Sequence, residues 1–196
     1  MLSKTQLRQH IFQLRQQLNQ DAQAQKSAEI SLHLLRHPWF DLSQHIACYL
    51  AFKGEVATGE IIQTLWQKKK SCYLPIVDAE HFQLAFALYN SETQMEKNRY
   101  GIEQPVYEPE AIILPIELDV VIMPLVGFDK RGNRLGMGAG FYDRSLAFKS
   151  QQTKPLKPRL IGLAYDFQRV DELPVQAWDV KLDAVVTESG WQIFKH

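Results

Sequence analysis

The chain has 196 residues, of which 45% are hydrophobic, a size and composition typical of a globular domain with a proper core. Its 22 basic and 22 acidic residues balance, which argues against a surface that coats nucleic acid. No apolar run approaches the roughly 20 residues that span a membrane, and the first residues lack the apolar core of a signal peptide. We therefore expect one cytoplasmic domain over residues 1–196, binding neither nucleic acid nor membranes.

The chain begins with a predicted amphipathic helix. Its apolar residues recur at helical spacing, at Leu7, Ile11, Leu14 and Leu18. A basic stripe lies on a neighbouring face, formed by Lys4, Arg8 and Arg15. A second helix is predicted to begin near Asp21, a favourable N-cap residue, and to end before Pro38. The apolar positions of the second helix are Ala24, Ala28, Leu32 and Leu35.

The next predicted strand is buried and runs from His45 to Phe52, followed by a tight polar turn at residues 53–55. Thr58 is predicted to cap a helix with apolar residues at 61, 62, 65 and 66. Two further strands are predicted at Cys72–Val77, where Pro75 breaks the strand, and at His81–Tyr89. The two cysteines, at positions 48 and 72, lie in apolar runs, so we expect buried, reduced thiols rather than a zinc site.

Residues 90–118 are polar and punctuated by prolines, which predicts a long loop with irregular pieces. An apolar strand follows at Asp119–Pro124, and a helix is predicted near Phe141. Two more buried strands are predicted, at Leu160–Ala164 and Asp183–Thr187. Short apolar strands alternating with helices predict an α/β fold, a three-layer α/β/α sandwich with a largely parallel central sheet.

In a parallel sheet, ligands bind beyond the carboxyl ends of the strands. The turn at Glu55, the loop after Pro124 and the segment after Ala164 all leave such ends. We therefore expect them at one edge of the sheet.

The most informative stretch is the glycine run at residues 136–140, with Arg134 before it and Asp143 and Arg144 after it. Glycines permit close backbone approach, and successive amides in such a loop can converge on an anion. The spacing matches neither the phosphate loop of nucleotide triphosphatases nor the dinucleotide-binding fingerprint. A turn that only lets a helix pack on a strand remains an alternative. The flanking charges favour a polyphosphate site in which Asp143 holds a metal ion.

Beyond this run, the longer stretch Asp119–Arg144 closely resembles the signature of the 5-formyltetrahydrofolate cyclo-ligases, also called 5,10-methenyltetrahydrofolate synthetases. The resemblance extends in the same order over nearly the whole chain. It includes the segments Tyr49–Glu55, Ile102–Pro105, Ile161–Gln168, Leu173–Pro174, Trp178–Asp179 and Val185–Glu188.

This resemblance implies an ATP- and Mg²⁺-dependent ring closure that converts 5-formyltetrahydrofolate to 5,10-methenyltetrahydrofolate, with release of ADP and phosphate. In that family the formyl oxygen is thought to attack the γ-phosphate, giving an iminium phosphate that N10 then displaces. Such chemistry needs positioned cations and amides more than an activated nucleophile. We expect a monomer whose partners are 5-formyltetrahydrofolate and ATP.

The family's site residues are carried over position by position. Arg134 and Asp143 are expected to be catalytic, with Asp143 and Asp179 as the magnesium ligands. The expected ATP-binding residues are Lys4, Arg8, Arg134, Leu135, Gly136, Met137, Gly138, Ala139, Gly140, Phe141 and Tyr142. The expected folate-binding residues are Leu50, Glu55, Tyr100, Met137, Gly138, Ala139, Gly140 and Phe141.

The chain also departs from the family pattern. Some members have basic residues where this chain has Met137 and Ala139, and a tyrosine is frequent at Phe141. Glu103 stands where a proline is common. Two other functions stay open from the residues alone. One is a non-catalytic sensor of a nucleotide or folate, and the other is a sugar-phosphate isomerase or CoA-type enzyme on a similar fold.

Overall fold

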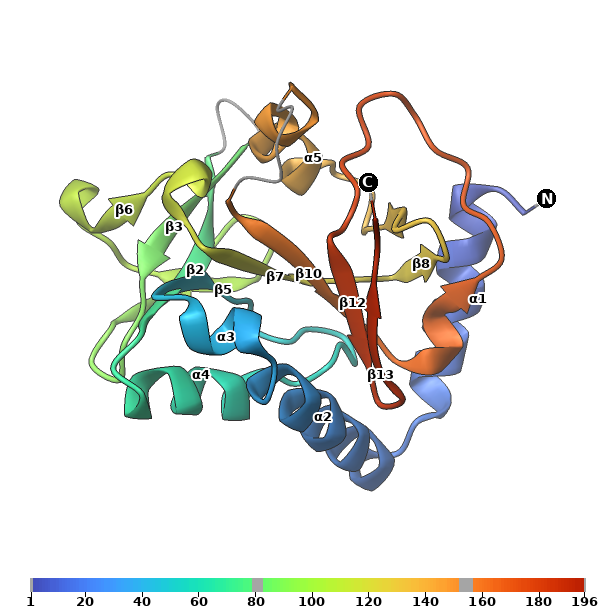
Figure 1. Cartoon of the computed structure of the whole chain (residues 1–196), viewed down its shortest axis with the longest axis horizontal. Helices are drawn as coiled ribbons and strands as arrows, with labels where there is room; N and C mark the ends of the chain where they lie inside the picture. Colours follow the sequence, from blue (N-terminus) through green and yellow to red (C-terminus); the bar gives the residue numbers. More distant parts are fainter. Residues whose placement is uncertain (1, 79–82, 152–156, 196) are drawn as a thin grey trace.

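The structure is a computed structural model that describes residues 2–78, 83–151 and 157–195. Its centre is an eight-stranded sheet in the order β13-β12-β10-β7-β1-β2-β3-β6 (Figure 1). The five inner strands, from β12 to β2, run parallel, whereas β13, β3 and β6 are antiparallel additions at the two edges. This confirms the predicted α/β class and the largely parallel sheet.

The strands of this sheet are β1 (His45–Ala47), β2 (Ser71–Asp78), β3 (Gln83–Leu88), β6 (Ile112–Ile113), β7 (Val120–Pro124), β10 (Arg159–Leu163), β12 (Ala184–Thr187) and β13 (Gly190–Ile193). Two small sheets contain β4 (Met95–Lys97) with β5 (Glu103–Pro105), and β8 (Gly127–Asp129) with β9 (Arg134–Leu135) and β11 (Arg169–Val170). The helices are α1 (Lys4–Gln17), α2 (Gln20–Leu35), α3 (Pro38–Leu42), α4 (Gly59–Gln67) and α5 (Phe141–Ser145). Short 3₁₀ turns lie at Pro109–Ala111, Pro115–Glu117, Ala147–Gln151 and Asp166–Gln168.

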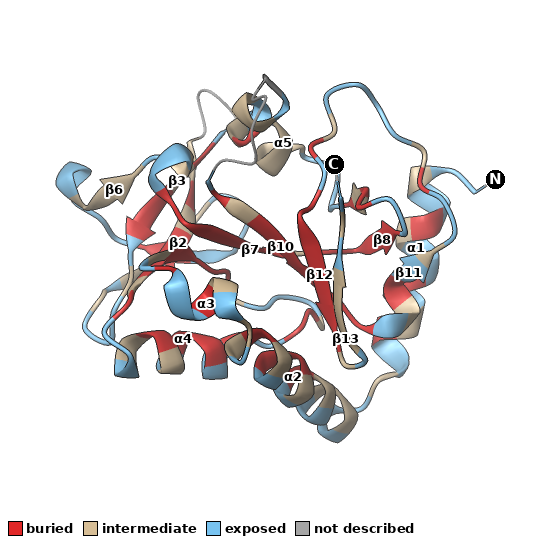
Figure 2. Cartoon of the chain, viewed as in Figure 1, coloured by how far each residue is buried: buried red, intermediate tan, exposed pale blue. Residues whose placement is uncertain are grey.

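Each face of the central sheet has its own hydrophobic core, because alternate side chains of a strand point to opposite faces. Ile46, Val120 and Ile122 belong to the core under α2, α3 and α4, whereas Ala47 and Val121 belong to the core on the α5 side. Figure 1 shows these helices on opposite sides of the sheet, and Figure 2 shows the buried strands between them. The predicted three layers are therefore present, although α5 makes the second helical layer thin.

Helix α1 stands apart from these layers and packs on the small sheet of β8, β9 and β11 (Figure 1). Ser3 caps the helix, and its hydroxyl oxygen accepts a hydrogen bond from the Gln6 N–H. Leu7 and Ile11 bury against Val126. Because β8 and β9 follow the end of β7, this packing brings α1 to the carboxyl edge of the parallel strands.

The buried face of α2 differs from the predicted one. Ser27, Ile30 and Leu34 are buried, as is Ser31 between them, whereas the predicted apolar positions Ala24, Ala28 and Leu32 are exposed. The N-cap is Asn19, whose side chain accepts a hydrogen bond from the Ala22 N–H, and not Asp21. Ser27 accounts for part of this difference, because its hydroxyl oxygen accepts a hydrogen bond from the Ala57 N–H and lies 3.5 Å from the Tyr165 hydroxyl oxygen, a polar contact inside the fold.

Two strand predictions and one helix-cap prediction also need correction. β1 ends at Ala47, five residues before the predicted end. Pro75 does not break β2, since it pairs with Phe86 inside the β2–β3 ladder. Thr58 occupies the N-cap of α4, but its hydroxyl donates to the Tyr49 carbonyl oxygen instead of capping the helix.

The prediction for residues 81–89 holds from Gln83 onward, and its first two residues lie outside the described part of the chain. The expected loop at 90–118 contains the β4–β5 hairpin and β6. The sequence did not predict the edge strand β13. Cys48 and Cys72 are buried and unbridged as expected. Within the described ranges, no helix has the length and apolar character needed to cross a bilayer.

Candidate active site

The described residues enclose a cavity of about 950 Å³ at the carboxyl ends of the parallel strands. Pro124, at the end of β7, and Glu55, in the connection after β1, both line it. Tyr165, after β10, lies at the same edge and donates its hydroxyl hydrogen to the Glu55 carbonyl oxygen at 3.3 Å. The predicted common edge is therefore confirmed.

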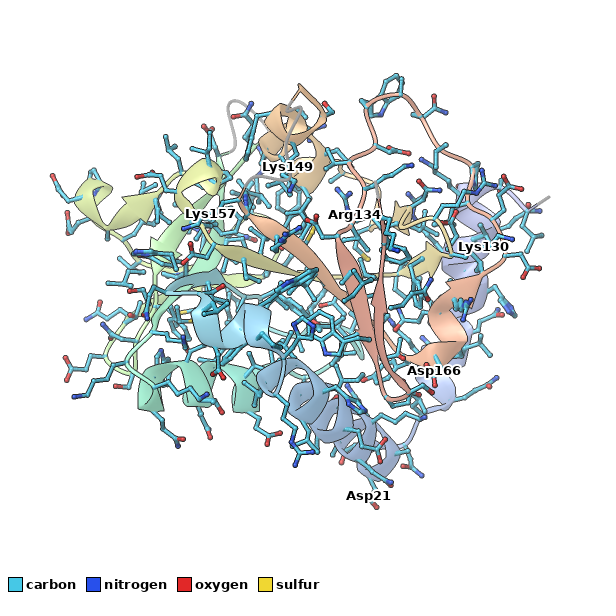
Figure 3. All side chains as sticks on the ribbon, in the orientation of Figure 1. Asp21, Lys130, Arg134, Lys149, Lys157 and Asp166 are labelled. Atoms are coloured by element: carbon cyan, nitrogen blue, oxygen red, sulfur yellow. The ribbon has the colours of Figure 1, made fainter. Side chains whose placement is uncertain are left out.

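Every residue that the sequence nominated for the site lines this one cavity. They are Lys4, Arg8, Leu50, Glu55, Tyr100, the run from Arg134 to Tyr142, Asp143 and Asp179. Figure 3 labels Arg134, which lies in that view between α5 and β8. The structure thus brings together residues separated by most of the sequence.

The glycine run forms an irregular turn between β9 and α5. Gly138 has φ +111° and Gly140 has φ +69°, both in the left-handed region that favours glycine. Arg8 crosses from α1 and donates its Nε–H to the Gly136 carbonyl oxygen at 2.8 Å. Arg144 donates from the other side to the Ala139 carbonyl oxygen at 2.5 Å. Two guanidinium groups therefore border the turn and leave a cationic rim.

Arg134 and Asp143 form an ion pair at the base of this turn, with Nη2 2.6 Å from Oδ1. Arg134 also donates to the Val180 carbonyl oxygen, and the Val180 N–H donates to Asp143 Oδ1 at 3.1 Å. Burial lowers the pKa of the Arg134 guanidinium, and the negative charge of Asp143 opposes that shift. An arginine remains protonated even so, which makes the pair a fixed charge pair.

The second acidic residue of the site, Asp179, lies beside this pair. Its Oδ2 accepts from Lys4 Nζ and from the Gln176 N–H, both at 2.9 Å. Within the described part of the chain, Asp143 Oδ2 and Asp179 Oδ1 have no hydrogen-bond partner. Mg²⁺ is usually held by one or two carboxylates together with substrate phosphates, so these two free oxygens suit it. No group of three or more His, Cys, Asp or Glu side chains gathers for a metal among the described residues.

Glu55 lines a second part of the cavity, distinct from the part that the glycine run borders, and is 9% exposed. Its Oε2 accepts the Phe52 N–H at 3.0 Å. Burial raises the pKa of the Glu55 carboxyl, while the Phe52 N–H and the charge of Arg15 oppose the rise. Burial likewise raises the pKa of Tyr142, and the negative charge of Glu55 adds to that shift. A buried carboxylate of this kind is well suited to accept hydrogen bonds from a flat polar ligand.

An aromatic wall connects the two parts of the cavity. Tyr100 packs edge-on against Phe141, with ring centroids 5.7 Å apart and an interplanar angle of 73°. Arg99 donates to the Tyr100 hydroxyl at 2.7 Å, which orients the ring. Trp178 also lines the cavity although it is 69% exposed. Because Phe141 replaces a tyrosine that is frequent in the resembled family, this wall is apolar at that position.

Sequence reasoning missed several lining residues. Phe12, Asn98 and Gln176 line the cavity and no short motif marks them, whereas Phe52 and Trp178 also line it and lie within the matched segments Tyr49–Glu55 and Trp178–Asp179. Arg15 is the most informative case, because the sequence placed it on a basic stripe beside the apolar face and not among the site residues, yet it is buried and lines the cavity with Lys4 and Arg8. The helical spacing of Arg15 is the clue that links it to the cavity, since residues 4, 8 and 15 share one face of α1.

The chain resembles proteins of known activity over most of its length. The sequence profile of the 5-formyltetrahydrofolate cyclo-ligase family matches residues 1–188. The 5-formyltetrahydrofolate cyclo-ligase of Haemophilus influenzae is 39% identical, over 91% of this chain and 94% of that protein. The Escherichia coli K12 protein of the same name is 36% identical, over 91% of this chain and 97% of that protein.

Solved structures agree with the sequence matches. The 5,10-methenyltetrahydrofolate synthetase of Aquifex aeolicus superposes with a TM-score of 0.82 at 30% identity, covering 98% of this chain and 93% of that one. The corresponding synthetase of Mycoplasma pneumoniae gives a TM-score of 0.74 at 28% identity, covering 95% of this chain and 99% of that one. The similarity therefore covers nearly the whole chain.

Proposed function

The chain belongs to the 5-formyltetrahydrofolate cyclo-ligase family, and from this premise we propose that it uses ATP and Mg²⁺ to close 5-formyltetrahydrofolate into 5,10-methenyltetrahydrofolate. One observation carries the proposal. A single cavity is bordered by cations, glycines and two acidic residues in one part, and by a buried carboxylate and aromatic rings in the other. A triphosphate suits the first part and a pterin ring suits the second. Membership of this family disfavours the sensor and isomerase alternatives.

The proposed reaction has two steps. The formyl oxygen attacks the γ-phosphorus of ATP, and ADP leaves with the electron pair of the broken P–O bond. N10 then attacks the activated formyl carbon and loses its proton, while phosphate leaves with the electron pair of the C–O bond. The formyl oxygen thus ends in the released phosphate, and a new N10–C bond closes the ring. Phosphorylation is needed because the oxygen of an amide-like formyl group is a poor leaving group.

The residues of the turn supply what this transfer needs. Lys4 and Arg8 from α1, with residues 134–142, would bind and orient the phosphates, since phosphoryl transfer depends on positioning and charge neutralisation. Asp143 and Asp179 would hold the ion through their free oxygens. Bound Mg²⁺ would supply positive charge to the transferring phosphoryl group. Arg134 fixes Asp143 and adds its own charge at the same place.

The folate would lie in the second part of the cavity. Glu55 Oε1 has no hydrogen-bond partner in the described part of the chain and would accept from the pterin. Leu50 and Tyr100 would border the rings, and the turn from Met137 to Phe141 would border both the folate and the phosphates. This arrangement supports direct contact between the formyl oxygen and the γ-phosphate.

The decisive experiment mixes purified protein with 5-formyltetrahydrofolate and Mg-ATP and follows the absorbance of the methenyl product. ATP-dependent formation of that product, with one ADP released per ring closed, is expected. Omission of either ATP or Mg²⁺ provides the control. A protein that forms no product under these conditions, while remaining folded, would rule out the proposed activity.

A further inference from the structure

Arg15 is a buried cation whose hydrogen-bonding capacity is largely unused. The residue is 5% exposed and lines the cavity. Its Nη2 donates to the Leu125 carbonyl oxygen, but Nε and Nη1 have no partner among the described residues. A buried donor without an acceptor is costly, and for a charged group the cost is larger. Such a group facing a cavity is therefore expected to meet an acceptor on a ligand.

Glu55 lies on the turn against which Arg15 packs. A Cβ on Gly54 would lie 3.8 Å from the Arg15 Cβ, so α1 runs directly beside that turn. The charge of each residue affects the pKa of the other, yet no ion pair joins Arg15 to Glu55 in the described part of the chain. The cavity thus presents unused donors on Arg15 next to an unused acceptor, Glu55 Oε1.

The position of Arg15 on α1 separates it from the phosphate part of the site. Arg15 follows Arg8 by seven positions, which at 1.5 Å per residue corresponds to about 10 Å along the helix axis. Arg8 contacts the glycine run at Gly136, whereas Arg15 contacts Leu125 and neighbours Glu55. Arg15 therefore belongs to the folate part of the cavity. Its burial suits a flat ring rather than a flexible, solvated tail.

The pterin ring of 5-formyltetrahydrofolate has an edge complementary to this pair. The ring carries a 2-amino group and an N3–H, both donors, directly beside the C4 carbonyl oxygen, an acceptor. We propose that Arg15 binds the 4-oxo group of the pterin while Glu55 binds its N3–H and 2-amino group, so that Arg15 selects 4-oxo over 4-amino pteridines. This inference rests on the proposed function for the identity of the ring.

A matched pair of ligands tests the proposal. Folic acid and aminopterin differ at C4, where folic acid has an oxo group and aminopterin has an amino group that would place a donor against Arg15, and at N3, which bears a hydrogen only in folic acid. Their Kd values would be measured by titration calorimetry without ATP, for the wild type, Arg15→Gln and Arg15→Met. Arg131→Gln is the control, because Arg131 is exposed, pairs with Glu172 and does not line the cavity.

The wild type and the control are expected to bind folic acid at least about tenfold more tightly than aminopterin, the scale of one charge-assisted hydrogen bond. Both Arg15 variants should reduce that ratio severalfold, leaving only the part that comes from the N3–H contact with Glu55. An unchanged ratio in either folded variant overturns the proposal. If both variants fail to fold, the wild type still decides, because equal or weaker binding of folic acid also overturns it. Wild-type turnover is measured separately, so a failed activity assay and a failed selectivity test are distinguishable.

Discussion

Arg134 and Asp143 face each other across the glycine-rich turn, with Nη2 2.6 Å from Oδ1 and the arginine side chain only 7% exposed. Arg134 belongs to β9 and Asp143 to α5, so this one contact joins the two ends of the turn. Both side chains also bond the backbone of Val180. The shape of the turn is therefore set by protein contacts before any phosphate arrives.

Arg134→Ala is expected to slow turnover by at least about tenfold, because a charge-assisted contact contributes roughly 1.5–3 kcal/mol. Steady-state kcat measured by methenyl-product absorbance tests this. Arg131→Ala is the matched control, since that arginine forms an exposed pair with Glu172. A kcat equal to that of the wild type would remove Arg134 from the phosphate site.

Asp143→Asn is expected to change the Mg²⁺ dependence of the reaction, because an amide is a weaker ligand than a carboxylate for a hard cation. Titration of Mg²⁺ at fixed ATP should show a half-saturation concentration raised by about tenfold or more. Asp41→Asn is the control, since Asp41 forms an exposed pair with Lys68 away from the cavity. Identical titrations for Asp143→Asn and the wild type would dismiss the metal role of Asp143.

Lys4→Met separates the stabilising role of the Lys4–Asp179 pair from its role in the site. Both side chains are partly exposed, at 30% and 18%, so the loss in unfolding free energy should be no more than about 1 kcal/mol. The KM for ATP is expected to rise severalfold, because Lys4 borders the phosphates. Lys68→Met, which breaks an exposed pair elsewhere, should leave that KM unchanged. An unaltered KM in Lys4→Met would place Lys4 outside the ATP site.

Gly138→Ala and Gly136→Ala form a matched pair within one turn. At Gly138, φ is +111° and an added Cβ would lie 3.4 Å from Arg8 Nη2, whereas a Cβ on Gly136 meets nothing within 4 Å. Gly138→Ala should therefore lower the unfolding free energy by about 1–2 kcal/mol, and Gly136→Ala by much less. Urea denaturation of both variants measures this. Equal destabilisation would contradict the described conformation of the turn.

Glu55 makes stability depend on pH in an unusual direction for a carboxyl group. Burial raises its folded-state pKa above the ordinary value of 4.5, against the opposing effects of the Phe52 N–H and Arg15. The folded chain then binds the Glu55 proton more tightly than the unfolded chain. The resulting contribution to stability is present below pH 4.5 and is lost as pH rises through the folded-state pKa.

The Glu55→Gln variant tests the direction of this change in stability with pH. Its unfolding free energy relative to the wild type is expected to increase as pH rises from 4.5 through the raised pKa, because the variant has no buried charge to form. Urea midpoints measured across that range provide the comparison. In the wild type alone, the KM for 5-formyltetrahydrofolate should rise on acidification as the carboxylate is protonated. A relative stability independent of pH would contradict the raised pKa.

Much of the central sheet could be predicted, because its inner strands are apolar runs that need no knowledge of their neighbours. Val120–Pro124 and Ala184–Thr187 are such strands, and their predicted positions hold within one residue. Pro75 could not be placed correctly from the sequence. Its missing N–H is compatible with β2 only at a position where the ladder does not require a donor, and pairing with β3 decides that.

The nominated site residues could be located because the long motif includes most of them, and the structure brings them to one cavity. Arg15 shows the limit of such reasoning. A cation eleven residues after Lys4 is ordinarily solvated, and only the packing of α1 on β8 and β9 buries it. The shift of the buried face of α2 has a similar cause, since Ser27 is buried through contacts with Ala57 and Tyr165 that no periodicity reveals.

The bond between Lys4 and Asp179 joins positions 175 residues apart. During synthesis, α1 leaves the ribosome long before the segment that carries Asp179 exists. The nascent chain must therefore keep a helix with three cations available while its docking surface on β8 and β9, and finally its acidic partner, are still being made. The phosphate part of the cavity can therefore be completed only late in synthesis. A chain on a ribosome that has stalled before residue 179 would lack a complete site.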